Sequence, residues 1–131
     1  MAERLVVIAE VAERLRGLGT ANFLYSDSDA LFVHADHRTQ PGSDVVLPGL
    51  HVLARSCEEP VPNLAGSGVT LETASQALTL VASVPLTTED WRPMARGEVL
   101  AIADGRILER YLATPASDVG RVCRPHDSQG G

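Results

Sequence analysis

The chain has 131 residues, 44% of them hydrophobic and 21% charged, values that are typical of one soluble globular domain. Its net charge of -6 at pH 7 argues against a nucleic-acid-binding protein, because such a protein presents a clustered basic surface. All 11 basic residues are arginines, so no lysine is present to form a Schiff base with a substrate.

The sequence has no pattern of a membrane-spanning or secretory segment. No apolar run approaches the roughly 20 residues of a transmembrane helix, and acidic residues flank the apolar cluster Leu5–Ala9, unlike a signal peptide. Cys57 and Cys123 lie far apart and have neither metal-binding spacing nor the pattern of a disulfide framework. We therefore expect a reducing, cytoplasmic setting.

Residues 2–18 are predicted to form an amphipathic helix that ends at Gly19. The helix begins almost at Met1, without a capping residue before it. Apolar residues recur at steps of three and four residues and are expected to face the core: Leu5, Ile8, Ala12, Leu15 and Leu18.

About six strands follow the helix. Asp104-Gly105 is the strongest hairpin signal, and Asp27-Ser28-Asp29 is expected to link an earlier strand pair. The predicted strands are Ala21–Ser26, Ala30–Ala35, Leu50–Cys57, Ala77–Val84, Glu98–Ala103 and Arg106–Leu112, with a short further strand at Val69–Glu72.

The segments between these strands are rich in turn-forming residues. Residues 36–48 and 58–68 are predicted loops, broken by proline and glycine. Thr87 or Thr88 is expected to cap a single helical turn that runs to Trp91. Residues 113–131 are rich in Pro, Ser, Gly and charge, and we expect a disordered tail there.

The predicted fold class is α+β, with the N-terminal helix packed on a mainly antiparallel sheet. Apolar residues occur on both sides of its strands, since Val81 lies opposite Leu80, and Leu100 lies opposite Val99. One helix covers only one face of a sheet. We therefore expect a second covering layer from another subunit or from another half of the same fold.

Three neighbouring residues could bind a metal ion. His34 and Asp36 are two residues apart and share a strand face, and His37 follows them. The sequence offers no third ligand from elsewhere, so solvent-facing polarity at a strand end is the favoured interpretation. The Asp27-Ser28-Asp29 loop resembles the start of a calcium loop, but Leu31 and Val33 occupy the following ligand positions.

Other candidates have simpler structural interpretations. His51 and Cys57 would lie about 20 Å apart on one strand, too far for a nucleophile and its base. Gly66-Ser67-Gly68 is too short for a phosphate loop, and Ser83 lacks the glycines of a nucleophile elbow. Remaining candidates are Cys57 as a small core residue, Trp91 as a hydrophobic anchor, and Arg38 and Arg55 as surface arginines or carboxylate-binding groups.

Two segments resemble the bacterial class II glutamine amidotransferases of the YafJ-like kind. The first is LRGLGTANFLYSDSDALFVHAD, residues 15–36, and the second is LTLVASVPLTTEDWRPMARGEVLAIADGRIL, residues 78–108. The resemblance spans about residues 5–110 and is most specific in the second segment, while residues 38–76 match poorly. The residues that carry it are Pro85, Leu86, Thr87, Trp91, Met94, Gly97 and Glu98.

The resemblance implies an N-terminal-nucleophile hydrolase fold, in which two antiparallel sheets are stacked between helical layers. It also implies a family reaction in which an N-terminal cysteine attacks the amide of glutamine and its own α-amine acts as the base. This chain has Ala2 after Met1, so neither the nucleophile nor the family's substrate-binding residues are expected in it.

These observations lead to the prediction that residues 1–112 form the C-terminal half of a class II glutamine amidotransferase domain, followed by a tail at 113–131. We expect the chain to be inactive alone, with no catalytic, cofactor-binding or metal-binding residues, and to pair with the missing N-terminal half or with a second copy. Glutamine would be the substrate only of the complete protein. One alternative is a non-catalytic module that dimerises through an uncovered sheet face. A third interpretation is a metal-dependent enzyme that uses His34, Asp36 and His37.

Overall fold

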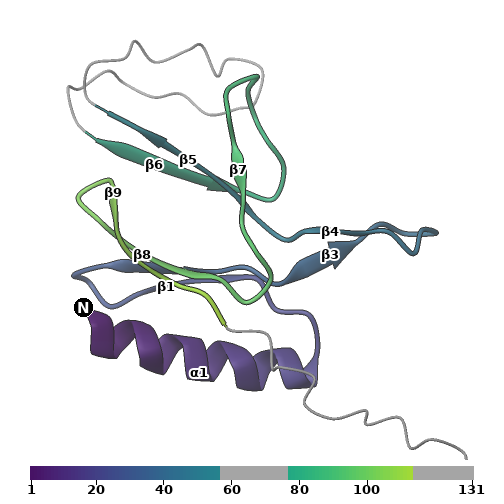
Figure 1. Cartoon of the computed structure of the whole chain (residues 1–131), viewed down its shortest axis with the longest axis horizontal. Coiled ribbons are helices and arrows are strands. Elements are labelled where there is room, and N and C mark those ends of the chain that lie inside the picture. The colour runs from purple at the N-terminus through teal and green to yellow at the C-terminus, as the bar shows by residue number, and fades with distance from the viewer. Residues whose placement is uncertain (57–76, 114–131) are drawn as a thin grey trace, which may run out of the picture.

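The computed structural model describes residues 1–56 and 77–113 (Figure 1). The short strand expected at Val69–Glu72, the Gly66–Gly68 loop, both cysteines and the tail from residue 114 lie outside the described residues. The elements form one helix and nine strands in the described ranges, in antiparallel pairs, which confirms the predicted α+β fold.

Helix α1 runs from Ala2 to Leu18, as the apolar spacing predicts. It begins at Met1 without a side-chain cap, and at its C-terminal end the backbone N–H of Gly19 donates to the carbonyl of Leu15. The side that faces the sheet is shifted from the predicted one, because Leu15 and Leu18 are 39% and 88% exposed. The buried residues of α1 are Leu5, Ala9 and Ala12.

The first sheet contains four strands in the order β1-β2-β8-β9. Both hairpins that the sequence indicates are present, and Asp104 and Gly105 adopt positive φ at the β8–β9 turn. This pair of left-handed residues matches the twist of a two-residue hairpin. The strands are β1 (Phe23–Ser26), β2 (Leu31–His34), β8 (Val99–Ala103) and β9 (Arg106–Tyr111).

The second sheet contains three strands in the order β6-β5-β7, namely β6 (Leu78–Ala82), β5 (His51–Arg55) and β7 (Arg92–Pro93). A separate hairpin joins β3 (His37–Thr39) to β4 (Val46–Pro48). The prediction of a loop over residues 36–48 is therefore wrong, and β7 was not predicted. Both elements are too short to show a periodic sequence pattern.

The three layers are α1, the four-stranded sheet and the three-stranded sheet (Figure 1). Alternate residues of β2 and β8 point to opposite sides and form two cores. The core under α1 contains Leu5, Ala9, Ala30, Phe32, Val99 and Ala101. The core between the sheets contains Val33, Ala35, Leu50, Val52, Met94, Leu100 and Ile102.

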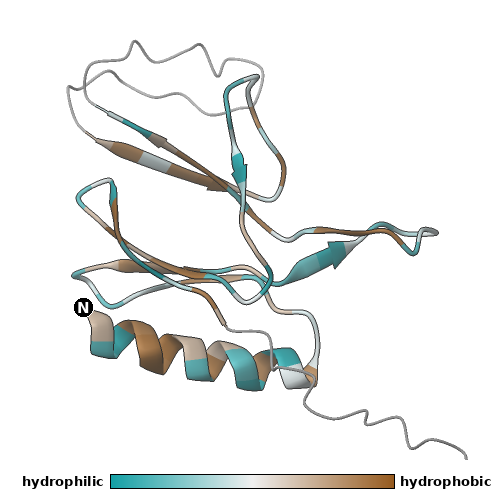
Figure 2. Ribbon diagram, viewed as in Figure 1, coloured by the Kyte–Doolittle hydropathy of each residue, from teal (hydrophilic) through white to brown (hydrophobic). Residues whose placement is uncertain are grey.

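Both faces of the central strands β2 and β8 are consequently covered within the chain. Figure 2 shows hydrophobic residues along the strands of both sheets and a mixture of hydrophobic and hydrophilic residues around α1. The expectation that this sheet would have one uncovered face is wrong, because the sequence pattern cannot show that six strands divide into two stacked sheets. Complete burial of a side chain such as Phe32 or Leu100 contributes about 1.5–3 kcal/mol relative to exposure.

In the described part of the chain, α1 is too short and too polar to cross a membrane.

Candidate functional site

A buried carboxylate, Asp36, joins the ends of several elements near the C-terminus of α1. Its side chain is 1% exposed. Its carboxylate oxygens accept hydrogen bonds from the backbone N–H of Ala21 at 3.2 Å, from Nδ1 of His37 at 2.8 Å and from Nε of Arg96 at 2.8 Å. Its own backbone N–H donates to Asn22 Oδ1 at 2.7 Å. The cluster therefore fixes the chain on both sides of the β1–β2 hairpin.

The electrostatics of Asp36 suit a structural anion. Burial alone raises the pKa of Asp36, but the hydrogen bonds from His37, Arg96 and the Ala21 N–H outweigh burial and lower that pKa below its ordinary value. A carboxylate with a lowered pKa stays ionised at neutral pH and is a weak base. With three donors already on its oxygens, Asp36 is suited to holding backbone and arginine groups in place.

A second buried carboxylate, Glu98, immediately precedes strand β8 and is completely buried. It accepts from Arg92 Nη1 at 3.1 Å, from the backbone N–H of Ala95 at 2.7 Å and from Arg110 Nε at 2.7 Å. Burial raises the pKa of Glu98, and the bonds from Arg92, Ala95 and Arg110 outweigh burial and lower it. Glu98 thus ties β7, the following turn and β9 to the start of β8.

His34 ends β2 on the side of the sheet that faces α1, and it is fully buried. Its ring packs against Phe23 with a centroid distance of 5.1 Å, and neither ring nitrogen has a hydrogen-bond partner in the residues the structure describes. Burial, with the nearby charge of Arg16, lowers the pKa of His34 below its ordinary value. His34 is therefore a neutral core histidine at pH 7.

The hypothesis of a metal site at His34, Asp36 and His37 is not favoured by this geometry. Asp36 and His37 bond to each other, while His34 packs into the core under α1. Among residues 1–56 and 77–113, no group of three His, Cys, Asp or Glu side chains is placed to hold a metal ion.

Another polar cluster lies on the outer face of the second sheet. Trp91 is 6% exposed, which confirms its predicted role as an anchor, and its Nε1 donates to Thr87 Oγ1 at 2.9 Å. Thr87 Oγ1 donates in turn to Glu89 Oε2 at 2.7 Å, and Glu89 forms an ion pair with the buried Arg55.

The segment from Thr87 to Trp91 is a series of bends, so the predicted helical turn is wrong. The threonine hydroxyl bonds to side chains here instead of capping a helix.

The turn between β7 and β8 brings the two sheets together. Met94 is buried between them, and its backbone N–H donates to Leu50 O at 2.9 Å. Gly97 has φ of 82°, and a β-carbon at this position would lie 2.8 Å from Arg16 Nη1. Its N–H donates to Ala35 O at 2.8 Å. Its positive φ favours glycine here, while the end of the flexible Arg16 side chain could move away from a β-carbon.

The structure places the other predicted candidates apart from one another. Asp27 accepts from the N–H groups of Asp29 and Ala30 and from Arg4, an arrangement that organises the β1–β2 turn instead of a calcium site. Arg38 lies on β3, where its Nε donates to the carbonyl of Pro48, and it is on a different sheet from Arg55.

His51 begins β5, and its predicted companion Cys57 is outside the described residues. Ser83 follows β6 in a bend.

Sequence reasoning did not identify the Glu98 cluster or the pair of Arg55 with Glu89. One signal was available for the former, since Glu98 is an acidic residue at the first position of an otherwise apolar strand. Its partners Arg92 and Arg110 are six and twelve residues away, so no helical or strand spacing connects them. Both clusters contain residues of the segment PLTTEDWRPMARGE, residues 85–98. The members of the two clusters bond within the protein and therefore have structural roles.

Comparison with known proteins gives one match. The family model described as glutamine amidotransferases, class II, matches residues 1–121. No curated protein and no solved structure matches the chain.

Proposed function

The chain belongs to the class II glutamine amidotransferases, and from this premise we propose that it supplies the scaffold half of a glutamine-hydrolysing domain. In this proposal the chain corresponds to the C-terminal half of a bacterial, YafJ-like member and is inactive alone. The observation that carries the proposal is the structural use of the motif: Trp91, Met94, Gly97 and Glu98 all pack or bond within the protein.

The layer arrangement supports the same proposal. The resemblance implies two sheets between two helical layers, and the described residues form one helix and two stacked sheets, besides the β3–β4 hairpin. In the described part of the chain, no helix lies over the outer face of β6-β5-β7 (Figure 1). The missing N-terminal half of the domain would supply that helical layer, and with it the catalytic residues.

The chemistry of the described residues also favours a scaffold. Residues 1–56 and 77–113 contain no cysteine, so the described residues offer no thiol nucleophile. The buried carboxylates Asp36 and Glu98 are held by arginines and backbone N–H groups, so neither is placed as a general base.

In the proposed complete domain, a cysteine thiolate from the missing N-terminal half would attack the glutamine amide carbon. The carbon–sulfur bond would form and the carbon–nitrogen bond would break, and ammonia would leave with a proton from the cysteine's α-amine. Water would then hydrolyse the thioester to glutamate and regenerate the thiol. We further propose a cytoplasmic location, supported by the wide separation of Cys57 and Cys123.

Ammonia release from glutamine tests this proposal. The purified chain should release no ammonia above the buffer background, and its Cys57→Ser variant should behave identically. Co-expression with a segment that begins Met-Cys and is encoded next to this chain should produce glutaminase activity, which replacement of that cysteine by alanine should abolish. Glutaminase activity of the purified chain alone would refute the proposed inactivity.

A non-catalytic module that dimerises through a sheet face is the second candidate. The observation that bears on it is the outer face of the second sheet, where Leu78 and Leu80 are only half-buried. Substitution of Leu80 by Glu should then shift a dimer to a monomer in size-exclusion chromatography, with glutamine hydrolysis absent under every condition. An active complex with a Met-Cys segment would rule out this candidate.

A further inference from the structure

An exposed apolar stripe runs along the whole of α1. It consists of Val7, Val11, Leu15 and Leu18, which are 57%, 43%, 39% and 88% exposed. Their spacing of four, four and three residues places them on one side of the helix. Val7 lies nearly opposite the buried Leu5 and Ala9, and Leu15 lies nearest the buried side, so α1 has a second apolar surface that the chain's own sheet does not cover.

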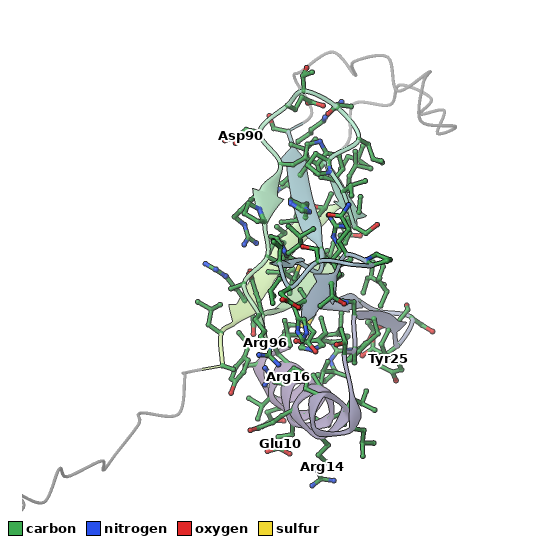
Figure 3. All side chains as sticks on the ribbon, turned by 90° about the vertical axis from the view of Figure 1, so that its right-hand side faces the viewer. Glu10, Arg14, Arg16, Tyr25, Asp90 and Arg96 are labelled. Atoms are coloured by element: carbon green, nitrogen blue, oxygen red, sulfur yellow. The ribbon has the colours of Figure 1, made fainter. Side chains whose placement is uncertain are left out.

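The stripe faces the edge of the four-stranded sheet that ends in β1. Figure 3 looks along α1 and shows Arg16 on one flank of the helix and Tyr25 of β1 on the opposite flank. At about 100° per residue, the stripe lies on the flank away from Arg16 and therefore on the side of Tyr25. Helix α1 packs mainly on β8, β9 and β2.

A single helix leaves part of such a sheet uncovered. Four strands about 4.8 Å apart span more than the roughly 10 Å width of one helix. On the face toward α1 the uncovered part is the β1 edge, where Tyr25 pairs with Phe32 and is 48% exposed, while Leu24 pairs with Val33 and points to the other face. The stripe on α1 and the side chain of Tyr25 therefore form the two sides of one apolar surface. We call this surface the step.

A groove lies at the N-terminal end of this step. Its volume is about 360 Å³, and its apolar lining comes from Val7 and Ile8 of α1, Tyr25 of β1 and Phe32 of β2. Charged groups such as Arg4 also line it. The groove is large enough for a leucine side chain, and the opposite end of α1 carries Leu18, the most exposed of the large hydrophobic side chains that the structure describes.

We propose that a second copy of this chain covers the step, with its α1 antiparallel to the first about a two-fold axis. The middle of the stripe lies between residues 12 and 13, so in this arrangement Leu18 of each copy lies beside Val7 of the other and enters its groove. The contact is isologous, because each copy supplies both the leucine and the groove. The proposal does not rest on the proposed enzymatic function.

Charge on the flank of the stripe agrees with this arrangement. Glu10 and Arg14 lie at the lower side of α1 in Figure 3, and within the described part of the chain neither forms an ion pair. About the same two-fold axis, Glu10 of one copy lies within about one residue, roughly 1.5 Å along the helix, of Arg14 of the other. A parallel two-fold pair would instead place these residues of the two copies on opposite flanks of the contact.

Sedimentation equilibrium of the full chain, at concentrations from micromolar upward, tests the proposal. The wild type should be a dimer, and Leu18→Glu should weaken it by more than about tenfold, because a carboxylate would lie against Val7 and beside the acidic Glu3 and Asp27 of the groove. Arg14→Glu should also weaken the dimer, and adding Glu10→Arg to that variant should restore it by reversing both charges. Val6→Glu is the matched control, because Val6 is 47% exposed on the other flank of α1 and should leave the dimer intact.

Two results would overturn the proposal. A wild type that remains monomeric at high micromolar concentration would show that a second copy does not bind the step. A dimer that tolerates Leu18→Glu, or that the double charge reversal fails to restore, would place the contact elsewhere. Circular dichroism of each variant checks that α1 and the sheets are still folded.

Discussion

Replacement of Glu98 by Gln tests whether the buried carboxylate clusters hold the two sheets together. The change keeps the size of the side chain and removes its charge. The amide NH₂ would then face N–H donors, since the carboxylate oxygens accept from Arg92, Ala95 and Arg110. We expect a large loss in the free energy of unfolding.

The size of this loss in unfolding free energy depends on how far each hydrogen-bond donor to Glu98 is exposed to solvent. A hydrogen bond to a buried charge contributes about 1.5–3 kcal/mol, and the Ala95 N–H bond at 2.7 Å qualifies for this range. The side chains of Arg92 and Arg110 are 39% and 46% exposed, so water screens them and each contributes only about 0.5 kcal/mol. The expected loss is about 3 kcal/mol for Glu98→Gln.

Urea denaturation followed by circular dichroism at pH 7 measures this loss. Glu13→Gln is the control, because Glu13 is exposed on α1 and has no ion pair in the described residues, so its effect should be within about 0.5 kcal/mol. Equal stabilities of the wild type and Glu98→Gln would refute the assignment of Glu98 as a structural anchor.

The stability difference between the wild type and Glu98→Gln should depend on pH. The pKa of Glu98 in the folded protein lies below its ordinary value of 4.5, so its contribution to stability is complete above pH 4.5. This contribution is lost as the pH falls through the folded-state pKa. The stability difference between the wild type and Glu98→Gln should therefore shrink below pH 4.5, and a difference that grows there would contradict the reasoning.

Three further experiments test other contacts by the same denaturation assay. Gly97→Ala should lose about 2 kcal/mol, because its φ is 82°, a conformation that strains any side chain. Gly17→Ala, with open space around it, should gain about 0.5–1 kcal/mol, and equal effects at the two sites would contradict this. Trp91→Phe and Thr87→Val should show a coupling of about 1 kcal/mol, since they share a 2.9 Å hydrogen bond, and additive effects would exclude it. Asp36→Asn should lose about 2 kcal/mol, because its carboxylate accepts from three donors, and an unchanged midpoint would refute that role.

The parts of the fold that could be predicted are those with local signals. The spacing of apolar residues marks α1, and Asp104-Gly105 marks the β8–β9 hairpin, because a two-residue turn with positive φ favours this pair. Leu15 and Leu18 fit the same helical periodicity as Leu5, yet they remain exposed. Periodicity shows that a helix has an apolar side, and only the width of the sheet decides how much of that side is covered.

The parts that could not be predicted depend on contacts between distant segments. Strand β7 has two residues and exists because Arg92 and Pro93 pair with Val52 and His51, about 40 residues earlier. Thr87 has the spacing of a helix cap, but its hydroxyl bonds to side chains of the same bend. The Glu98 cluster was missed for the same reason, since its donors come from β7, a turn and β9.

Trp91 is the chain's single tryptophan, and its burial beside β5 gives the protein an intrinsic optical reporter. Its indole is hydrogen-bonded through Thr87 and Glu89 to Arg55, so its emission wavelength follows the integrity of the second sheet. The far-ultraviolet signal of α1 follows the opposite layer. Coincident fluorescence and ellipticity transitions would show that the three layers unfold as one cooperative unit, and a fluorescence transition at lower denaturant would show that the second sheet opens first.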